Sequence, residues 1–254
     1  AFCWGAVPRR LSILPPHLNN SYRLLASLMT GTQQHVDGQY FPDTQFRLCQ
    51  QFVSPAASSE KKLSFTTSSQ ANQLPEALFW VGLLISSGRA LKRLSDEQLG
   101  QIVQGLINIK ASKPVGVVLL GGPGDKAQAA QVIQRMAMTQ SDANLVDTVG
   151  QYQLAELPKV LSQLKVLLGV DSGVTHMADA LGVPVVCIAG PVDLNEVYQP
   201  SAKRQLFKSY LPCYPCSTVF NTPNKCRIGE RLCLNQLDTE ELLKQVVRLI
   251  KNKS

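Results

Sequence analysis

The sequence predicts an α/β fold in which a parallel sheet is covered by helices. From residue 76 onward, short apolar runs alternate with segments of helical periodicity. The runs are apolar at successive positions, as expected for strands that are buried on both faces of a parallel sheet. Residues 1–75 are less regular, so we predict a partial N-terminal domain and linker at 1–75 and a complete domain at 76–254.

The first expected elements of the complete domain are a strand, a helix and a second strand. The apolar run 78–85 predicts a buried strand. Ser95 is a candidate N-cap, with Gln98 three residues later, and apolar positions repeat with helical spacing over 99–107. Residues 115–120 predict the second buried strand. This order is typical of a parallel sheet with helical crossovers.

The same alternation continues to residue 170. A glycine-rich turn at 121–125 precedes a helix with an apolar face over 129–136. A short strand is expected near 145–146, then a helix over 154–164 and a buried strand at 166–170.

The remaining elements follow from similar signals. A short helix is expected at 174–181, with a Gly182 stop, and a strand at 184–189. Asp238 begins a capping pair for the last helix. In the N-terminal part, residues 21–29 predict one helix.

Composition bounds the function without deciding it. The 254 residues are 44% hydrophobic and 17% charged, and no run of about eighteen apolar residues could span a bilayer. Seven cysteines, an odd number, favour a reducing compartment, so we expect a soluble cytoplasmic protein. The net charge of +7 suits an anionic partner. Aromatic residues are only 6%, which makes single-stranded nucleic acid the weakest candidate.

The most informative motif is Asp171-Ser172-Gly173-Val174-Thr175-His176, because it joins a buried strand to a helix. Free N–H groups at a helix N-terminus suit a pyrophosphate, and Gly173 would let it come close. Ser172 and His176 share one face of the helix start, and Asp171 would accept from a hydroxyl. The structural alternative is a simple helix cap with a half-buried histidine.

The segments around this motif resemble glycosyltransferase family 9. Asp171-Ser172-Gly173, His176, Gly182-Val183-Pro184 and Gly190-Pro191 match the family pattern in order and spacing, and 119–125 matches its upstream glycine-rich motif. Lys92-Arg93, followed by Ser95, Asp96 and Glu97, is similar to the family signature Lys-(Arg/His)-Trp-Pro-x-Glu. Leu94 and Ser95 depart from that signature, while the lysine is kept.

The resemblance implies a GT-B architecture, in which a Rossmann-like donor domain follows a partial Rossmann-like N-terminal domain. It implies an inverting heptosyltransferase that needs no metal, with ADP-heptose as donor and Kdo or heptose on lipid A as acceptor. The protein would contact the cytoplasmic face of the inner membrane. The donor-binding residues implied are Ser87, Lys92, Gly121, Gly122, Asp171, Ser172, Gly173 and His176. The family's general base would lie upstream of residue 1.

Four cysteines follow the spacing Cys213-x2-Cys216-x9-Cys226-x6-Cys233, which is within reach of a zinc site but lacks a second CxxC pair. We expect the four thiols to lie close together, as a structural zinc site, as a disulfide pair or as free thiols. A second reading of the chain is therefore a non-catalytic, zinc-stabilised module that binds an anionic polymer or a partner. A GT-B transferase that uses another nucleotide sugar is a third.

Overall fold

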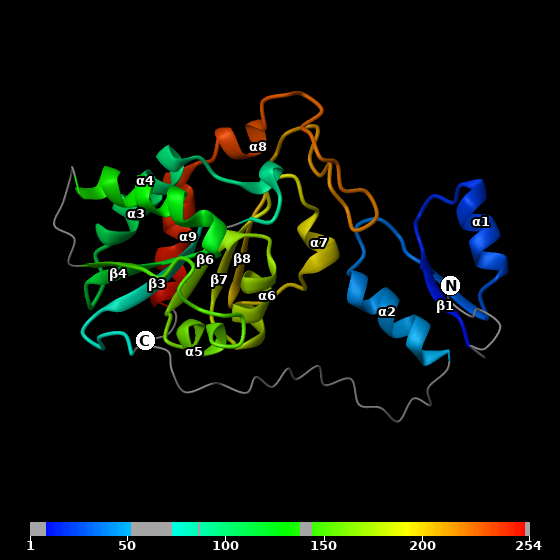
Figure 1. The fold of residues 1–254 in the computed structure, drawn as a ribbon, viewed down its shortest axis with the longest axis horizontal. Helices are drawn as coiled ribbons and strands as arrows, with labels where there is room; N and C mark the ends of the chain where they lie inside the picture. The colour runs from blue at the N-terminus through cyan, green and yellow to red at the C-terminus, as the bar shows by residue number, and fades with distance from the viewer. Residues whose placement is uncertain (1–8, 52–72, 86, 138–143, 252–254) are drawn as a thin grey trace. The chain divides into compact units, whose positions relative to one another are not determined.

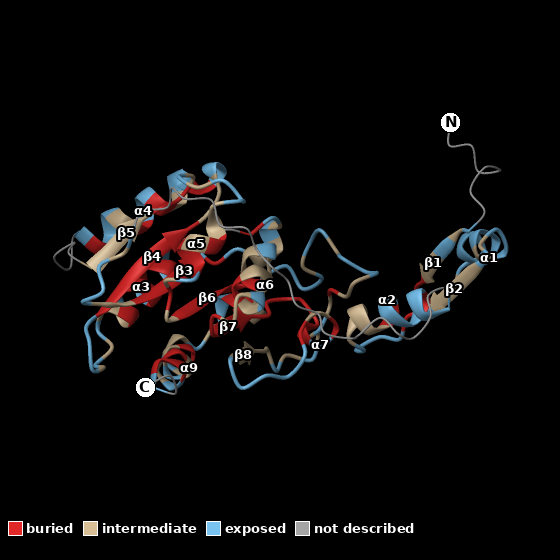
Figure 2. Cartoon of the chain, turned by 90° about the horizontal axis from the view of Figure 1, so that it is seen from below, coloured by how far each residue is buried: buried red, intermediate tan, exposed pale blue. Residues whose placement is uncertain are grey.

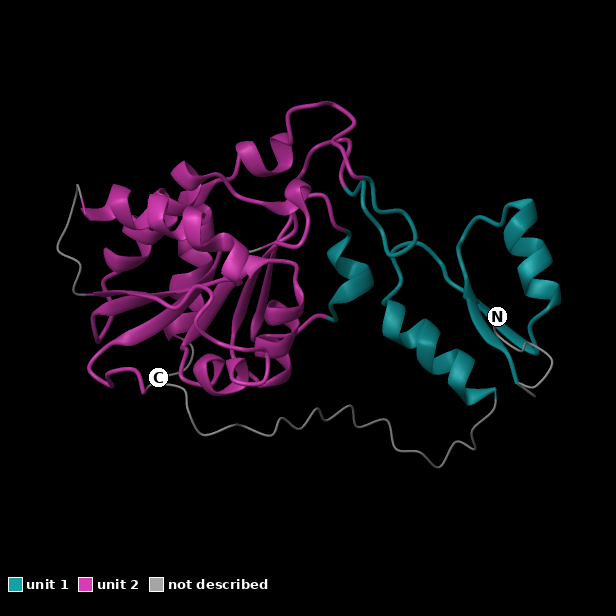
Figure 3. Cartoon of the chain, viewed as in Figure 1, with its two compact units in different colours: residues 1–61, 193–199, 215–223 teal, residues 62–192, 200–214, 224–254 magenta. Residues whose placement is uncertain are grey.

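The structure, a computed structural model, describes residues 9–51, 73–85, 87–137 and 144–251 (Figure 1). The chain divides into two compact units, shown in Figure 3. Unit 1 comprises residues 1–61, 193–199 and 215–223, and unit 2 comprises 62–192, 200–214 and 224–254. The predicted C-terminal domain thus gives two short segments to the N-terminal unit. We expected a domain boundary at residue 75. The units divide between residues 61 and 62, within the segment 52–72 that lies outside the described residues.

Unit 2 is built on a six-stranded sheet in which every pair of neighbouring strands is parallel, in the order β5-β4-β3-β6-β7-β8. The chain runs outward from β3 through β4 to β5, then returns to the other side of β3 and continues through β6 and β7 to β8. The predicted parallel α/β fold is confirmed. The strands are β3 (Phe79–Leu84), β4 (Val115–Leu120), β5 (Leu145–Asp147), β6 (Val166–Val170), β7 (Val185–Ile188) and β8 (Arg204–Phe207).

Helices cover the sheet and bury its apolar side chains (Figure 2). The main core lies between strands β3, β4, β6 and β7 and the helices α3, α4 and α9. Both faces of the central strands are buried, which explains their continuous apolar sequence. The helices of this unit are α3 (Asp96–Ile107), α4 (Lys126–Ala137), α5 (Leu157–Leu161), α6 (Gly173–Ala180), α8 (Leu232–Asn235) and α9 (Thr239–Lys251), with 3-10 turns η2 (Ala90–Lys92) and η3 (Pro123–Asp125).

The predicted caps set the helix ends. The Ser95 hydroxyl accepts from the backbone N–H of Gln98 at 3.2 Å, and the Gln98 side chain accepts from the N–H of Ser95 at 3.0 Å, which completes the capping box of α3. After α6, Gly182 adopts φ +76°, a left-handed conformation that glycine permits without strain. Asp238 accepts from the N–H of Glu241 at 2.9 Å at the start of α9.

Unit 1 contains a small parallel sheet and a buried polar cluster. Strands β1 (Leu11–Leu14) and β2 (Gly31–Gln34) pair in parallel, and α1 (Asn20–Ser27) connects them. Helices α2 (Phe41–Gln50) and α7 (Leu194–Val197) complete the unit. This βαβ segment is more regular than its polar sequence suggests.

The buried cluster of unit 1 joins segments that are distant in the sequence. His35 and Glu196 are 0% and 1% exposed at their side chains, and His35 Nε2 lies 3.4 Å from Glu196 Oε1. Thr44 Oγ1 lies 2.8 Å from the other ring nitrogen, His35 Nδ1. Glu196 also accepts from the backbone N–H groups of Gly38, at 3.2 Å, and Val219, at 2.7 Å. Polar groups buried in this way must be hydrogen-bonded, and these are.

Candidate nucleotide-binding site

The candidate site lies in unit 2 beside strands β3 and β6, at the point in the sheet where the strand order changes direction. Strands β3 and β6 are neighbours, but the chain leaves them toward opposite edges of the sheet. In open α/β sheets, ligands bind outside the carboxyl ends of the strands at such a switch point. The loop after β3 carries Ser87 and Lys92, and the loop after β6 carries the segment from Asp171 to His176. Residues about 80 positions apart in the sequence thus meet at the carboxyl ends of these two strands.

Asp171 is the centre of the polar contacts at this edge. Lys92 Nζ donates to the Asp171 backbone carbonyl at 2.6 Å and to Asp171 Oδ2 at 3.0 Å. His176 Nε2 lies 3.1 Å from Asp171 Oδ1. The Lys92 and Asp171 side chains are mostly buried, whereas the His176 side chain is 42% exposed. One carboxylate therefore orients both a lysine and a histidine.

These neighbours keep Asp171 ionised. Burial raises the pKa of its carboxyl. The hydrogen bond from His176, together with the charge and hydrogen bond of Lys92, lowers this pKa by more than burial raises it. The net result is a pKa below the ordinary value of an aspartic acid. At neutral pH the group is an anion that holds the Lys92 ammonium beside the start of α6.

The start of α6 is open to a ligand. Ser172 is the N-cap, and its hydroxyl accepts from the backbone N–H of Thr175 at 3.3 Å. Thr175 in turn donates from its hydroxyl to the Val170 carbonyl at 2.7 Å, which ties the helix start to β6. A side chain placed at Gly173 would meet no atom within 4 Å, so the first turn faces open space. Its free N–H groups and the helix dipole favour an anion there.

A cavity of about 260 Å³ adjoins this helix start. Gly121 and Gly122, which follow β4, line it together with Val174 of α6. The glycine-rich turn and the start of α6 therefore lie at the same end of the sheet, beyond the carboxyl ends of its strands. The other lining residues were not among the predicted site residues: Leu84, Leu120, Thr148, Tyr152, Leu154 and Leu157.

Ser87 and Arg93 shape the loop behind the site. Ser87 is 2% exposed, and its hydroxyl donates to the Arg89 carbonyl at 3.0 Å. Arg93 Nε donates to the Ser87 carbonyl at 3.2 Å, and its Nη2 lies 3.5 Å from Asp125 Oδ1. Asp125 Oδ2 accepts from the N–H of Gly122 at 2.9 Å. Arg93 and Asp125 lie within the two family motifs but were not among the expected site residues, and they join the loop after β3 to the glycine-rich turn.

The family model described as glycosyltransferase family 9 (heptosyltransferase) matches residues 22–226. The chain belongs to this family. No curated protein matches the chain in sequence.

Several solved structures of family 9 proteins share the fold at low sequence identity. Heptosyltransferase II from E. coli, an ADP-heptose LPS heptosyltransferase, is 15% identical with a TM-score of 0.63, over 98% of this chain and 72% of that one. A family 9 glycosyltransferase from Veillonella parvula is 18% identical with a TM-score of 0.60, over 95% and 74%. E. coli WaaC with ADP is 17% identical with a TM-score of 0.58, over 89% and 62%. These likenesses establish the GT-B fold.

The four cysteines of this family 9 chain form no disulfide in the structure. All four are described, and within the described residues no three His, Cys, Asp or Glu side chains gather to hold a metal ion. Cys233 packs against the core of unit 2, while backbone N–H groups, that of Arg231 first, lower the pKa of the Cys226 thiol.

The hydrogen bonds of Asp171 predict an acid-sensitive contribution to stability. Because its folded-state pKa is depressed, the contribution is complete above the unfolded-state pKa, near 3.8, and is lost as the pH falls through the folded-state value. We expect Asp171→Asn to have a lower urea midpoint than wild type at pH 6. The difference between the two midpoints should become smaller as the pH approaches 3. Urea titrations between pH 3 and 6 measure this, and a constant difference between the two proteins contradicts it.

Proposed function

We propose that this family 9 protein transfers heptose from ADP-heptose to the inner core of lipopolysaccharide, to Kdo or heptose on lipid A. The observation that carries the proposal is the cluster of Lys92, Asp171 and His176 beside the open α6 N-terminus and an apolar cavity. The cationic side chain and the helix dipole suit the diphosphate of a nucleoside diphosphate, and the apolar cavity suits its base. We propose that the reaction is inverting. We also propose that it needs no metal, because protein groups would neutralise the leaving diphosphate.

In the proposed complex, the diphosphate lies at the first turn of α6. Lys92 and the N–H groups at Gly173 would stabilise it, and these contacts strengthen as negative charge grows on the departing ADP. His176, which is partly exposed, would donate to a phosphate or a ribose hydroxyl. Asp171 acts through Lys92 and His176, so it is a positioning residue. We assign the general base to none of the described residues.

The adenine ring would occupy the 260 Å³ cavity between the glycine-rich turn and α6. Its lining is largely apolar, and Gly121 and Gly122 line it at the β4 end, where a flat ring would lie. A purine buries more apolar surface there than a pyrimidine does, which favours ADP over UDP. This choice separates the proposal from a transferase of another nucleotide sugar.

The acceptor and the place of action are part of the same proposal. A phosphorylated lipid A acceptor would keep the protein at the cytoplasmic face of the inner membrane, and the net charge of +7 is suited to an anionic surface. Among the described residues, no helix is long and apolar enough to cross a bilayer.

Calorimetric titration of the chain with ADP, ADP-heptose and UDP tests the proposal. We expect ADP and ADP-heptose to bind with similar affinity, and UDP to bind at least about tenfold more weakly, because a tenfold ratio requires only 1.4 kcal/mol. Equal or tighter binding of UDP would favour a different donor. An absence of heat with all three nucleotides would reject a donor site at this sheet edge.

Leu154 gives a test of the base-binding cavity that leaves the fold intact. It lines the cavity, yet it is 69% exposed, so its replacement removes little from the core. We expect Leu154→Asp to weaken ADP binding about five- to tenfold, through loss of apolar contact and repulsion of the diphosphate. Calorimetry measures the change, with melting temperature as a check on folding. Unchanged affinity would place the base outside this cavity.

A further inference from the structure

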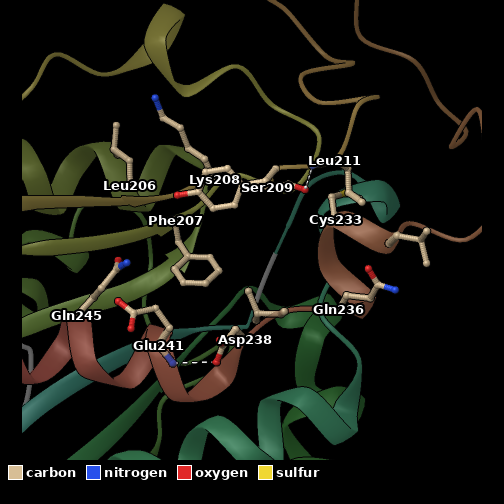
Figure 4. Close-up of a pocket in the computed structure, with 13 residues that line it drawn as sticks. Leu206, Phe207, Lys208, Ser209, Leu211, Cys233, Gln236, Asp238, Glu241 and Gln245 are labelled. Atoms are coloured by element: carbon tan, nitrogen blue, oxygen red, sulfur yellow. Dashed lines mark hydrogen bonds between the residues drawn. The ribbon is translucent and has the colours of Figure 1, made fainter.

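A second, larger cavity lies in unit 2 beside the edge strand β8. Its volume is about 570 Å³, and none of its lining residues belongs to the candidate nucleotide site. Figure 4 shows its walls: Phe207 and Lys208 come from the end of β8, Cys233 and Gln236 from α8 and its end, and Glu241 from α9. β8 and β5 are the two edge strands of the sheet, and the nucleotide cavity lies toward β5. The two cavities therefore occupy different ends of the strand order.

The lining combines apolar rings with both hydrogen-bond donors and acceptors. Phe207 supplies an aromatic surface. Tyr210 also lines the cavity and is fully exposed. Ser209 and Gln236 can each donate and accept, while Glu241 accepts only. An aromatic surface beside mixed polar groups is suited to a ligand that has both C–H faces and hydroxyl groups.

Gln245 adds an unmet hydrogen-bond acceptor to this wall. Its side chain lines the cavity, and its carboxamide oxygen is buried with no hydrogen-bond partner among the described residues. A ligand hydroxyl that reached this oxygen would donate to it and remove the cost of leaving a buried acceptor unpaired.

We infer that this cavity is a carbohydrate-binding site, which holds a pyranose ring against Phe207 and Tyr210 with its hydroxyls on Gln245, Glu241 and Gln236. The site is separate from the nucleotide-binding edge, so the inference does not depend on the proposed donor. Each sugar hydroxyl both donates and accepts, which fits a wall that offers both kinds of group.

An organic cation fits the cavity less well. Glu241 and Asp238 are negative, but Lys208 lines the same cavity. Arg248 Nη2 lies 3.9 Å from Glu241 Oε1, and an Asp238 carboxylate oxygen already accepts from the backbone N–H of Glu241. The negative charge is thus partly compensated, and the donors Ser209 and Gln236 would have no acceptor on an ammonium ligand.

Saturation-transfer NMR and calorimetry on the whole chain test the inference, with methyl α-mannopyranoside as a single ring, mannotriose as an oligosaccharide and spermidine as a cation. A single ring is expected to bind with a dissociation constant on the order of 1 mM. Tighter binding of mannotriose would identify the natural ligand as a longer glycan, and equal binding a single ring. Gln245→Ala and Tyr210→Ala are each expected to weaken binding by about fivefold or more.

Lys244→Ala is the matched control, because Lys244 lies on the same helix outside the cavity, with a side chain that is 55% exposed. We expect it to bind both sugars as wild type does, and we expect saturating ADP to leave sugar binding unchanged. The inference is overturned if neither sugar binds at millimolar concentration, if neither cavity variant weakens binding, if ADP displaces the sugar, or if spermidine binds and the sugars do not.

Discussion

Replacement of Lys92 with alanine is expected to weaken ADP binding by roughly ten- to 150-fold, about 1.5 to 3 kcal/mol, because the variant loses a charge-assisted contact in a largely water-excluded position. The Lys92 side chain is 13% exposed, and two hydrogen bonds to Asp171 hold its ammonium at the start of α6. A lysine held in this way loses little further freedom when the diphosphate arrives. His176→Ala should have a smaller effect, since His176 is 42% exposed.

Lys113→Ala is the matched control for this measurement. It removes the same charge, but Lys113 precedes β4 and so lies at the opposite edge of the sheet, where its Nζ donates to the Glu76 carbonyl. We expect its ADP affinity to match wild type at the same salt concentration. If Lys92→Ala also binds as wild type does, the diphosphate site is misplaced. If both variants lose affinity equally, only the overall charge matters.

The central strands and their helices could be predicted because their signals are local. Strand β4 matches the predicted range 115–120, and the capping box of α3 was readable from Ser95 and Gln98. Strand β8 was missed because it lies at the edge, half-buried, with Arg204 and Gln205 among its four residues. Strand β2 reads Gly-Thr-Gln-Gln, which carries no apolar pattern. Tertiary pairing decides such strands more than sequence propensity does.

Leu154 shows that an exposed apolar residue at a cavity rim can have the sequence spacing of a core residue. Its spacing from the apolar residues that follow predicted a helix over 154–164, but α5 spans only Leu157–Leu161. Leu154 instead lies exposed at the rim of the cavity beside α6. An apolar side chain at a cavity rim is as hydrophobic as one in the core, so periodicity alone cannot distinguish the two positions.

The candidate site was predictable to the extent that its residues are contiguous. Residues 171–176 form one motif at a strand end, whereas Lys92 could be linked to it only through the family resemblance. The role expected of Asp171, acceptance from a ligand hydroxyl, differs from its observed partners Lys92 and His176. The spacing of the four cysteines suggested a shared centre, but spacing does not fix where a loop of about twenty residues turns.

Removal of the Glu196 carboxylate is expected to produce the largest loss of stability, and the loss should be confined to unit 1. Glu196→Ala would leave the N–H groups of Gly38 and Val219 without their acceptor, and His35 without the partner of its Nε2, all in a buried position. Leaving a buried donor without its acceptor costs about 1 to 3 kcal/mol, so the loss of three such contacts is expected to cost about 3 kcal/mol or more. The edge-to-face contact of His35 with Phe41, at 5.3 Å between ring centroids, would then surround an uncompensated polar group.

Native-state hydrogen exchange measures this prediction residue by residue. In Glu196→Ala, the amides of Gly38 and Val219 should exchange faster by roughly a hundred- to a thousandfold if they open with unit 1, whereas amides of β4 and β6 in unit 2 should keep their protection. Glu196→Gln retains one acceptor oxygen but sets an amide N–H against a backbone N–H, so it should fall between wild type and alanine. Glu240→Ala, at an 82% exposed side chain, is the control and should change neither unit. Unchanged protection of both Gly38 and Val219 in Glu196→Ala would mean that the buried carboxylate does not hold the three segments of unit 1 together.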